Sequence, residues 1–295
     1  MKSLKRMSSK SKTHLLMIIP VVVLFFAFNT LPLIIGAFYS FTNYRGYGSW
    51  DFVGLRNYID LFSDTRVWNS YLFTFKYARA GTVLVNVISL LMALALNSKI
   101  RFKSALRGVY FIPNILGGLI VGYIFSFIFT YIIPTVGESL NIEWIKNSIL
   151  ADERFAWIGI LVVGVWQAVA MNTIIYISGL QTIPADVYEA AEIDGASVWK
   201  TYWKVIFPMM KPMHATVAVL TALGTWNDVM TPLVIMSGSE NTTLPLAQLN
   251  FQTQFGTNYN LAFASYLLSL IPILIFYIIC QKQIIGGVAN GAVKG

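Results

Sequence analysis

Residues 15–41 read LLMIIPVVVLFFAFNTLPLIIGAFYSF and contain no charged residue. A helix of this length reaches about 40 Å, which is enough to cross the ~30 Å hydrocarbon core of a bilayer. The five basic residues before it are typical of a signal peptide, but the apolar run is too long for one and lacks an A-x-A cleavage site. We therefore expect a retained transmembrane helix with a kink at Pro20 or Pro32.

The composition extends this conclusion to the whole chain. Of the 295 residues, 56% are hydrophobic and only 12% are charged, whereas a soluble domain has about 25% charged residues. So much apolar surface exceeds what a core of this size can cover, and part of it must face lipid. The single Cys280 excludes an internal disulfide, and with only two histidines, His14 and His214, the chain lacks the ligands of the common zinc sites.

Five further apolar segments follow the first one and read as helical spans. They lie at about 71–96, 109–133, 155–179, 213–236 and 261–281. We therefore expect an all-α, polytopic membrane protein with six transmembrane helices in a single domain over residues 15–281. A basic N-terminus at 1–14 precedes this domain, and a tail at 282–295 follows it. Between the third and fourth spans, the spacing of apolar residues over 134–154 predicts an amphipathic helix on the outer face.

The distribution of Lys and Arg over the loops gives the orientation. Fourteen of these residues lie in the N-terminus, in the loops at 97–108 and 182–212 and in the tail, whereas only five lie in the loops on the other side. Because loops rich in Lys and Arg stay in the cytoplasm, both termini are expected to be cytoplasmic. The same distribution explains the net charge of +8 without a nucleic-acid partner.

The sequence lacks a catalytic motif. Gly286 and Gly291 have the glycine spacing of a Walker A loop, but Ala292 stands where its Lys must follow. The chain contains neither a G-x-S-x-G elbow nor an H-E-x-x-H helix, and it has no pair of intramembrane acids. We therefore expect a protein that is not an enzyme, with no catalytic and no metal-binding residues.

The most informative cytoplasmic segment is residues 183–208, which read IPADVYEAAEIDGASVWKTYWKVIFP. Pro184 and the acids after it favour the start of a helix, and Gly195 offers a stop that tolerates positive φ. A second short helix follows from about Ser197 to Ile206, and its aromatic residues need a partner or a membrane interface. From these residues alone, a pair of amphipathic helices on the membrane surface is an open alternative.

Glu189-Ala190-Ala191, Gly195 and Val205-x-Phe207-Pro208 resemble the EAA loop of the permease subunits of ATP-binding-cassette importers. In that family the loop forms coupling helices that sit in a cleft of a separate ATPase subunit and transmit its closure to the membrane helices. Val205 and Phe207 replace the usual Ile and Leu, which preserves the apolar character. The coupling residues that the resemblance implies are Glu189, Ala190, Ala191, Asp194, Gly195, Ala196, Trp199, Trp203 and Pro208.

Other segments are similar to the carbohydrate importers of this family. Residues 52–58 (FVGLRNY), 111–114 (FIPN) and 179–184 (GLQTIP) resemble the first permease subunit of maltose-type and oligosaccharide importers, whereas TWND at 225–228 and GAVKG at 291–295 resemble the second. The resemblance implies the type I importer permease fold and a bacterial cytoplasmic membrane. It also implies that this chain binds no cofactor, and that ATP and Mg are used by the partner ATPase.

The partners that the resemblance implies are a second permease subunit in a heterodimer, two copies of a cytoplasmic ATPase and an extracytoplasmic sugar-binding protein. The expected function is therefore ATP-driven import of a sugar or oligosaccharide by alternating access. An ion-coupled secondary transporter of a small polar solute is the alternative, because six spans and an intramembrane acid can couple transport to protons. That alternative leaves the segment 183–208 unexplained.

Asp228 is the only acid well inside an apolar span. A charge in hydrocarbon costs at least about 2.5 kcal/mol, so the carboxylate should face protein or water, and Pro232 just beyond it should distort the helix. Polar residues here either line a sugar pathway or hold the helices together. The candidates for a substrate pathway are Asn172, Tyr176, Trp226, Asn227 and Asp228.

Lys76 and Arg79 lie near the outer start of the second span. Their long side chains can extend to the membrane interface, which is the simpler interpretation. If both cations faced the cavity instead, they would favour an acidic sugar.

Overall fold

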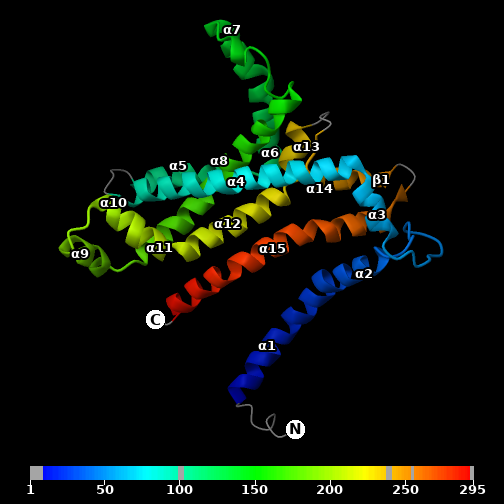
Figure 1. Cartoon of the computed structure of the whole chain (residues 1–295), viewed down its shortest axis with the longest axis horizontal. Coiled ribbons are helices and arrows are strands. Elements are labelled where there is room, and N and C mark those ends of the chain that lie inside the picture. The colour runs from blue at the N-terminus through cyan, green and yellow to red at the C-terminus, as the bar shows by residue number, and fades with distance from the viewer. Residues whose placement is uncertain (1–8, 99–102, 237–240, 254–255, 293–295) are drawn as a thin grey trace. The chain divides into compact units, whose positions relative to one another are not determined.

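The computed structural model describes residues 9–98, 103–236, 241–253 and 256–292. Within these ranges nearly all regular structure is helical, which confirms the all-α class (Figure 1). The chain forms two compact units, one of residues 1–64 and 250–268 and the other of residues 65–249 and 269–295. The expected N-terminal segment and tail lie partly outside the described residues.

The first unit begins with a long apolar helical segment. It consists of α1 (Ser9–Phe25), the π-helical turn η1 (Phe26–Thr30) and α2 (Leu31–Tyr39). Pro20 lies inside α1 without a break, whereas the irregular turn comes directly before Pro32. Because Pro32 has no N–H to donate to the preceding turn, a wider π-helical turn is accommodated there.

The first unit also contains α3 (Arg56–Ser63) and the two short strands β1 (Gln252–Thr253) and β2 (Gly256–Thr257). The helix α15 (Tyr259–Ala292) begins in this unit, which ends at residue 268. Asn57 is 3% exposed, and its Nδ2 donates to the carbonyl oxygens of Ser40 and Thr42, each at 2.7 Å. Its Oδ1 accepts a hydrogen bond of 2.9 Å from Asn260. One buried amide therefore joins the end of α2, the loop after it and the start of α15.

The second unit contains most of the helices. The longest are α4 (Thr65–Asn97), α8 (Glu153–Gln181) and α12 (Lys211–Trp226), together with α15 from residue 269 onward. The others are α5 (Lys103–Ile115), α6 (Gly118–Phe127), η2 (Ile128–Ile132), α7 (Ile133–Leu140), η3 (Glu143–Ile145), α9 (Ala185–Ile193), α10 (Val198–Thr201), η4 (Tyr202–Ile206), α11 (Phe207–Met209), α13 (Met230–Ile235) and α14 (Leu244–Gln248). The short turn η5 (Leu249–Phe251) follows α14.

The core of the second unit lies where α4, α8 and α12 pack side by side (Figure 1). The buried positions of α4 recur every three or four residues, as expected for one face of a helix. Small residues bring the helices close together. At Gly164 of α8, a Cβ would lie 2.7 Å from the hydroxyl oxygen of Tyr77, and at Gly81 it would lie 3.3 Å from Oγ1 of Thr225.

Five helices of the described residues are long and apolar enough to cross a membrane. They are Leu15–Tyr39, Thr65–Asn97, Gly118–Leu140, Arg154–Gln181 and Tyr259–Ile284. The pair Val198–Met209 and Lys211–Trp226, bent by 64°, would make a sixth span. The apolar segments of the sequence therefore coincide with helices, which confirms a polytopic helical membrane protein.

Two of the expected spans are each divided into two helices. The expected third span at 109–133 is divided, because α5 ends at Ile115 and a new helix starts after Gly117, which has extended backbone. The candidate span then continues to Leu140. The expected fifth span at 213–236 is also divided, since α12 ends at Trp226 and α13 begins at Met230. The second break confirms the distortion predicted ahead of Pro232.

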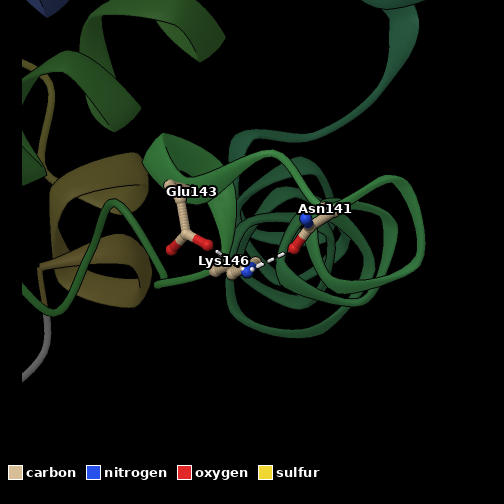
Figure 2. A network of polar contacts seen from close by, with 3 residues as sticks. All are labelled: Asn141, Glu143 and Lys146. Atoms are coloured by element: carbon tan, nitrogen blue, oxygen red, sulfur yellow. Dashed lines mark hydrogen bonds and ion pairs between the residues drawn. The ribbon is translucent and has the colours of Figure 1, made fainter.

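The segment after α7 is a tight turn where the sequence predicts a longer amphipathic helix. Asn141 ends α7 with φ 55°, a left-handed conformation that Asn tolerates. Its Oδ1 accepts a hydrogen bond of 2.8 Å from Nζ of Lys146, which also pairs with Glu143 (Figure 2). A Cβ at Gly137 would lie 2.8 Å from the carbonyl carbon of Ile145, so the chain folds back onto α7. This close approach prevents the helix from continuing.

We predict that Asn57→Ala destabilises the first unit by about 2 to 4 kcal/mol, because two buried carbonyl groups and one amide lose their partner. Thermal unfolding of the purified protein in detergent measures this loss. The control is Asn69→Ala at an exposed position of α4, which should change stability by no more than about 0.5 kcal/mol. Equal stability of the two variants would contradict the anchoring role of Asn57.

Candidate functional site

The loop that follows α8 begins with a short helix whose two ends are fixed by its sequence. Pro184 precedes α9 with extended backbone and a φ of −62°. At the other end Gly195 has a φ of +68°, and its N–H donates to the carbonyl of Glu192 at 2.9 Å. The N–H of Ala196 donates to the carbonyl of Ala191, also at 2.9 Å. This is a Schellman motif, and it confirms the positive φ predicted at Gly195.

The second part of the loop turns the chain into the membrane. The hydroxyl of Ser197 caps α10 by accepting a hydrogen bond of 3.3 Å from the N–H of Lys200. The π-helical turn η4 leads into α11, and Pro208 there has no N–H to donate to this preceding turn. The helical segments before and after Met210 meet at 64°. The loop is thus connected to α12 by a sharp bend.

Apolar side chains project from this loop. Ile193 and Val198 are each 86% exposed, and the indole rings of Trp199 and Trp203 are also exposed. The sequence analysis missed Ile193 and Val198, because a single apolar residue in an amphipathic helix usually belongs to its buried face. Clustered exposed apolar groups indicate a surface that another protein or the membrane covers.

The inner side of the loop is anchored to the core of the second unit. Ile206 is buried, and Ile183, Val187, Tyr202 and Val205 pack against the core. A cavity of about 770 Å³ lies between the loop and the ends of α4 and α8, and its lining includes residues 188, 192 and 202. The loop is therefore held at both ends and stands away from the bundle in its middle.

The nine predicted coupling residues occupy this one loop. Glu189, Ala190, Asp194, Gly195, Trp199 and Trp203 are exposed, Ala196 and Pro208 are half-buried, and Ala191 is buried. Six of the nine are therefore accessible for contact with another chain. Their contact with an ATPase stays a prediction.

Asp228 lies in the break between α12 and α13. Its Oδ1 accepts a hydrogen bond of 3.2 Å from the N–H of Thr231, in the first turn of α13. Its Oδ2 accepts a bond of 3.4 Å from the hydroxyl of Tyr77 on α4. The carboxylate thus satisfies the free N-terminus of a helix and contacts a neighbouring helix, as a residue that holds the bundle together does.

The other pathway candidates separate into buried and exposed residues. Trp226 is buried, and its Nε1 donates to the carbonyl of Ser269 at 3.1 Å. Asn172 and Tyr176 are buried as well, and Asn172 donates to the carbonyl of Ala168 in its own helix. Asn227 alone among the five is exposed, and it donates to the preceding turn. The five candidates therefore do not share one accessible surface.

The two intramembrane cations point to different surroundings. Nζ of Lys76 lies 3.8 Å from the centroid of the Trp157 ring, a cation–π contact between α4 and α8. Arg79 lines an apolar cavity of about 260 Å³ between α4, α12 and α15, with Phe75 and Phe276 among its neighbours. The structure does not bring the two cations into one cavity.

Buried Tyr176 forms a polar cluster with half-buried Asn86 and His214, which the sequence did not predict as its partners. These residues belong to α4, α8 and α12, which are far apart in the sequence. No local motif connects them, and only the packing of three helices identifies the cluster.

Comparison with known proteins finds relatives along most of the chain. Residues 85–289 match the family described as binding-protein-dependent transport system inner membrane component. The multiple sugar-binding transport system permease protein MsmF of Streptococcus mutans is 36% identical over 274 residues, which cover 91% of this chain and 92% of that protein. The probable starch degradation products transport system permease protein AmyD of Thermoanaerobacterium thermosulfurigenes is 34% identical over 226 residues, which cover 76% of this chain and 77% of that protein.

Two solved structures share the fold. One is a bacterial ABC transporter involved in the import of the acidic polysaccharide alginate, with a TM-score of 0.73 at 14% identity over 92% of this chain and 96% of that chain. The other is the bacterial alginate ABC transporter in complex with an alginate pentasaccharide-bound periplasmic protein, with a TM-score of 0.73 at 16% identity over 93% and 94% of the two chains. At these identities the likeness establishes the fold alone. With its helices, its loop after α8 and its relatives in agreement, this chain belongs to the family of binding-protein-dependent transport system inner membrane components.

Proposed function

We propose that this chain is the permease subunit of an ATP-driven importer of a sugar or oligosaccharide. The observation that carries the proposal is the loop over α9 to α11, which projects apolar and aromatic side chains and is connected by a bend to α12. A surface of this kind suits a groove on a separate ATPase. Closure of that ATPase would pull on the loop, and the bend would convert the pull into a rotation of α12.

The sugar assignment rests on relatives. MsmF and AmyD are named for the transport of multiple sugars and of starch degradation products, and they match most of this chain. A second permease of the same organism, MsmG, is 45% identical over 138 residues, which supports a pair of related subunits. The sugar would reach the pair from an extracytoplasmic binding protein, as the complex with a periplasmic protein suggests.

The remaining parts of the proposal follow from this arrangement. The complex would contain this chain, a second permease subunit and two ATPase subunits in the cytoplasmic membrane of a bacterium, with both termini of this chain in the cytoplasm. ATP and Mg would be bound by the ATPase subunits, and this chain would bind no cofactor. The chain itself would carry out no chemistry and would supply the passage and its coupling to hydrolysis.

For the substrate pathway, the contacts favour Asn227 over the other candidates. Its exposed amide can donate to and accept from sugar hydroxyls. Trp226, Tyr176 and Asn172 are buried, and Asp228 is occupied by an N–H and a hydroxyl. We assign these four to the stability of the bundle. The relatives are permeases of sugar transport systems, so the ion-coupled alternative is not favoured.

The first prediction concerns the energy source. Uptake into sealed vesicles that contain the complete complex and its binding protein should fall at least tenfold without ATP, and an uncoupler should change it less than twofold. Radiolabelled starch hydrolysis products, chosen from the name of AmyD, serve as the probe. Uptake driven by a proton gradient without nucleotide would support the secondary transporter instead.

The second prediction concerns Gly195. A Cβ at this position has no neighbour within 4 Å, so only the φ of +68° opposes a side chain. A β-branched residue resists this conformation at a cost of about 1 to 2 kcal/mol, whereas Asn tolerates it. Gly195→Val should therefore reduce the ATPase that copurifies with the permease at least fivefold, and the control Gly195→Asn should reduce it less than twofold. Full retention of the ATPase by Gly195→Val would refute the role of this turn.

The third prediction separates Asp228 from Asn227. Asp228→Asn should lower the stability of the complex by about 0.5 to 2 kcal/mol and leave the KM for uptake unchanged, because an amide keeps the acceptor for Thr231. Asn227→Ala should leave the yield normal and raise the KM about fivefold, as expected for the loss of about 1 kcal/mol of hydrogen bonding to substrate. A KM raised by Asp228→Asn and not by Asn227→Ala would reverse the assignment. Complex yield, thermal unfolding and the concentration dependence of uptake provide these values.

A further inference from the structure

The bend between α11 and α12 is the point where the loop enters the membrane-spanning bundle. The helical segments on its two sides meet at 64° around Met210, which is buried. His214 lies in the first turn of helix after this bend, and Phe207 lies just before it. The centroids of these two rings are 4.4 Å apart. The imidazole therefore belongs to α12, after the bend, and contacts Phe207 of α11, before the bend.

The imidazole of His214 is also connected to the rest of the core. Its Nδ1 lies 3.0 Å from the hydroxyl oxygen of Tyr176 on α8, a side chain with no exposed surface. The hydroxyl of Tyr176 donates to Oδ1 of Asn86 on α4 at 2.7 Å. Nδ2 of Asn86 donates to the carbonyl of Thr82 at 2.7 Å, which fixes the orientation of the amide. Three helices are thus joined by one row of hydrogen bonds.

The hydrogen bonds determine which nitrogen of His214 carries the proton. The hydroxyl of Tyr176 has one hydrogen, and it is used toward Asn86. Toward His214 the hydroxyl oxygen can therefore only accept, so Nδ1 must be the protonated nitrogen. Nε2 is buried and has no hydrogen-bond partner among the described residues. Nδ1 connects the ring to Tyr176, and Phe207 covers its face.

We propose that Asn86, Tyr176 and His214 form a positioning relay that transmits movement of the loop to α4 and α8. The proposal rests on the proposed function, because it needs a partner that moves the loop. Displacement of Phe207 would shift the imidazole, and the shift would reach Tyr176 and Asn86 through hydrogen bonds. The hydroxyl of Tyr176 is buried, so a broken bond would leave it without a partner.

The test uses the complete complex, with both permease subunits and the ATPase, in a Cys280→Ser background. Gly224→Cys places a reporter near the end of α12 at an exposed position where a Cβ meets no atom within 4 Å, and a membrane-impermeant maleimide measures its accessibility. The labelling rate is compared with and without ATP, Mg²⁺ and vanadate. ATP hydrolysis by the same samples is recorded in parallel. A variant that loses the nucleotide-dependent change in labelling is thereby distinguished from one that loses ATPase activity.

With the native relay, nucleotide should change the labelling rate at least fivefold. Tyr176→Phe should reduce this change to less than twofold, because His214 and Asn86 both lose their partner, while ATP is still hydrolysed. His214→Asn should retain the change, since its Nδ2 occupies the place of Nδ1, whereas His214→Gln should lose it, since its amide nitrogen reaches the place of Nε2. A merely structural role would not distinguish Asn from Gln in this way.

The control is Tyr110→Phe, which removes the hydroxyl of a half-buried tyrosine on α5 in the same unit. It should keep the nucleotide-dependent change. The relay is overturned if Tyr176→Phe and His214→Gln both keep the change, or if Tyr110→Phe loses it equally. If Tyr176→Phe does not assemble, the comparison of His214→Asn with His214→Gln decides alone. If nucleotide does not change the labelling rate while Asn86, Tyr176 and His214 are all unchanged, the proposed function is refuted. This outcome is seen before any of the three residues is replaced.

Discussion

The requirement that every backbone N–H and C=O be satisfied inside a membrane explains most of the polar chemistry of this chain. The bundle has two breaks, and a side chain serves each one. At the break between α5 and α6, Nε2 of Gln167 on α8 donates to the carbonyl of Leu116 at 3.1 Å. At the break between α12 and α13, Asp228 accepts from the N–H of Thr231. At these two places the polar side chain therefore compensates for an interruption of the helix.

This constraint limits what the sequence can predict. Hydropathy located the apolar segments, and Pro232 indicated the second break, because a proline in a helix interior removes a backbone hydrogen bond. The first break and the turn at Asn141 were not predicted, since they depend on partners such as Gln167 and on the close approach at Gly137. The polarity of Tyr176 left open whether it lines a pathway or holds helices together, and the packing adds its hydrogen bond to Asn86 on a neighbouring helix.

The loop was predicted better than the spans because its geometry is local. A Schellman motif needs a positive φ directly after a helix, and Gly195 supplies it without help from distant residues. The exposed apolar side chains of Ile193 and Val198 were missed for the opposite reason. Their exposure follows from the direction in which α9 and α10 leave the bundle, and no short sequence window contains that information.

These features meet in α12. It is an uninterrupted helix of 16 residues, about 24 Å long, bounded by the bend at Met210 and by the break at Asn227. Under the proposed function, a helix that is continuous between two interruptions would move as one body, so a rotation imposed at one end would reach the other. At one end of α12, His214 contacts Phe207 of the loop. At the other end, the amide of Asn227 is exposed. The positions of the two interruptions thus make α12 the continuous helix that would carry a movement of the loop to the break at Asn227 in the proposed function.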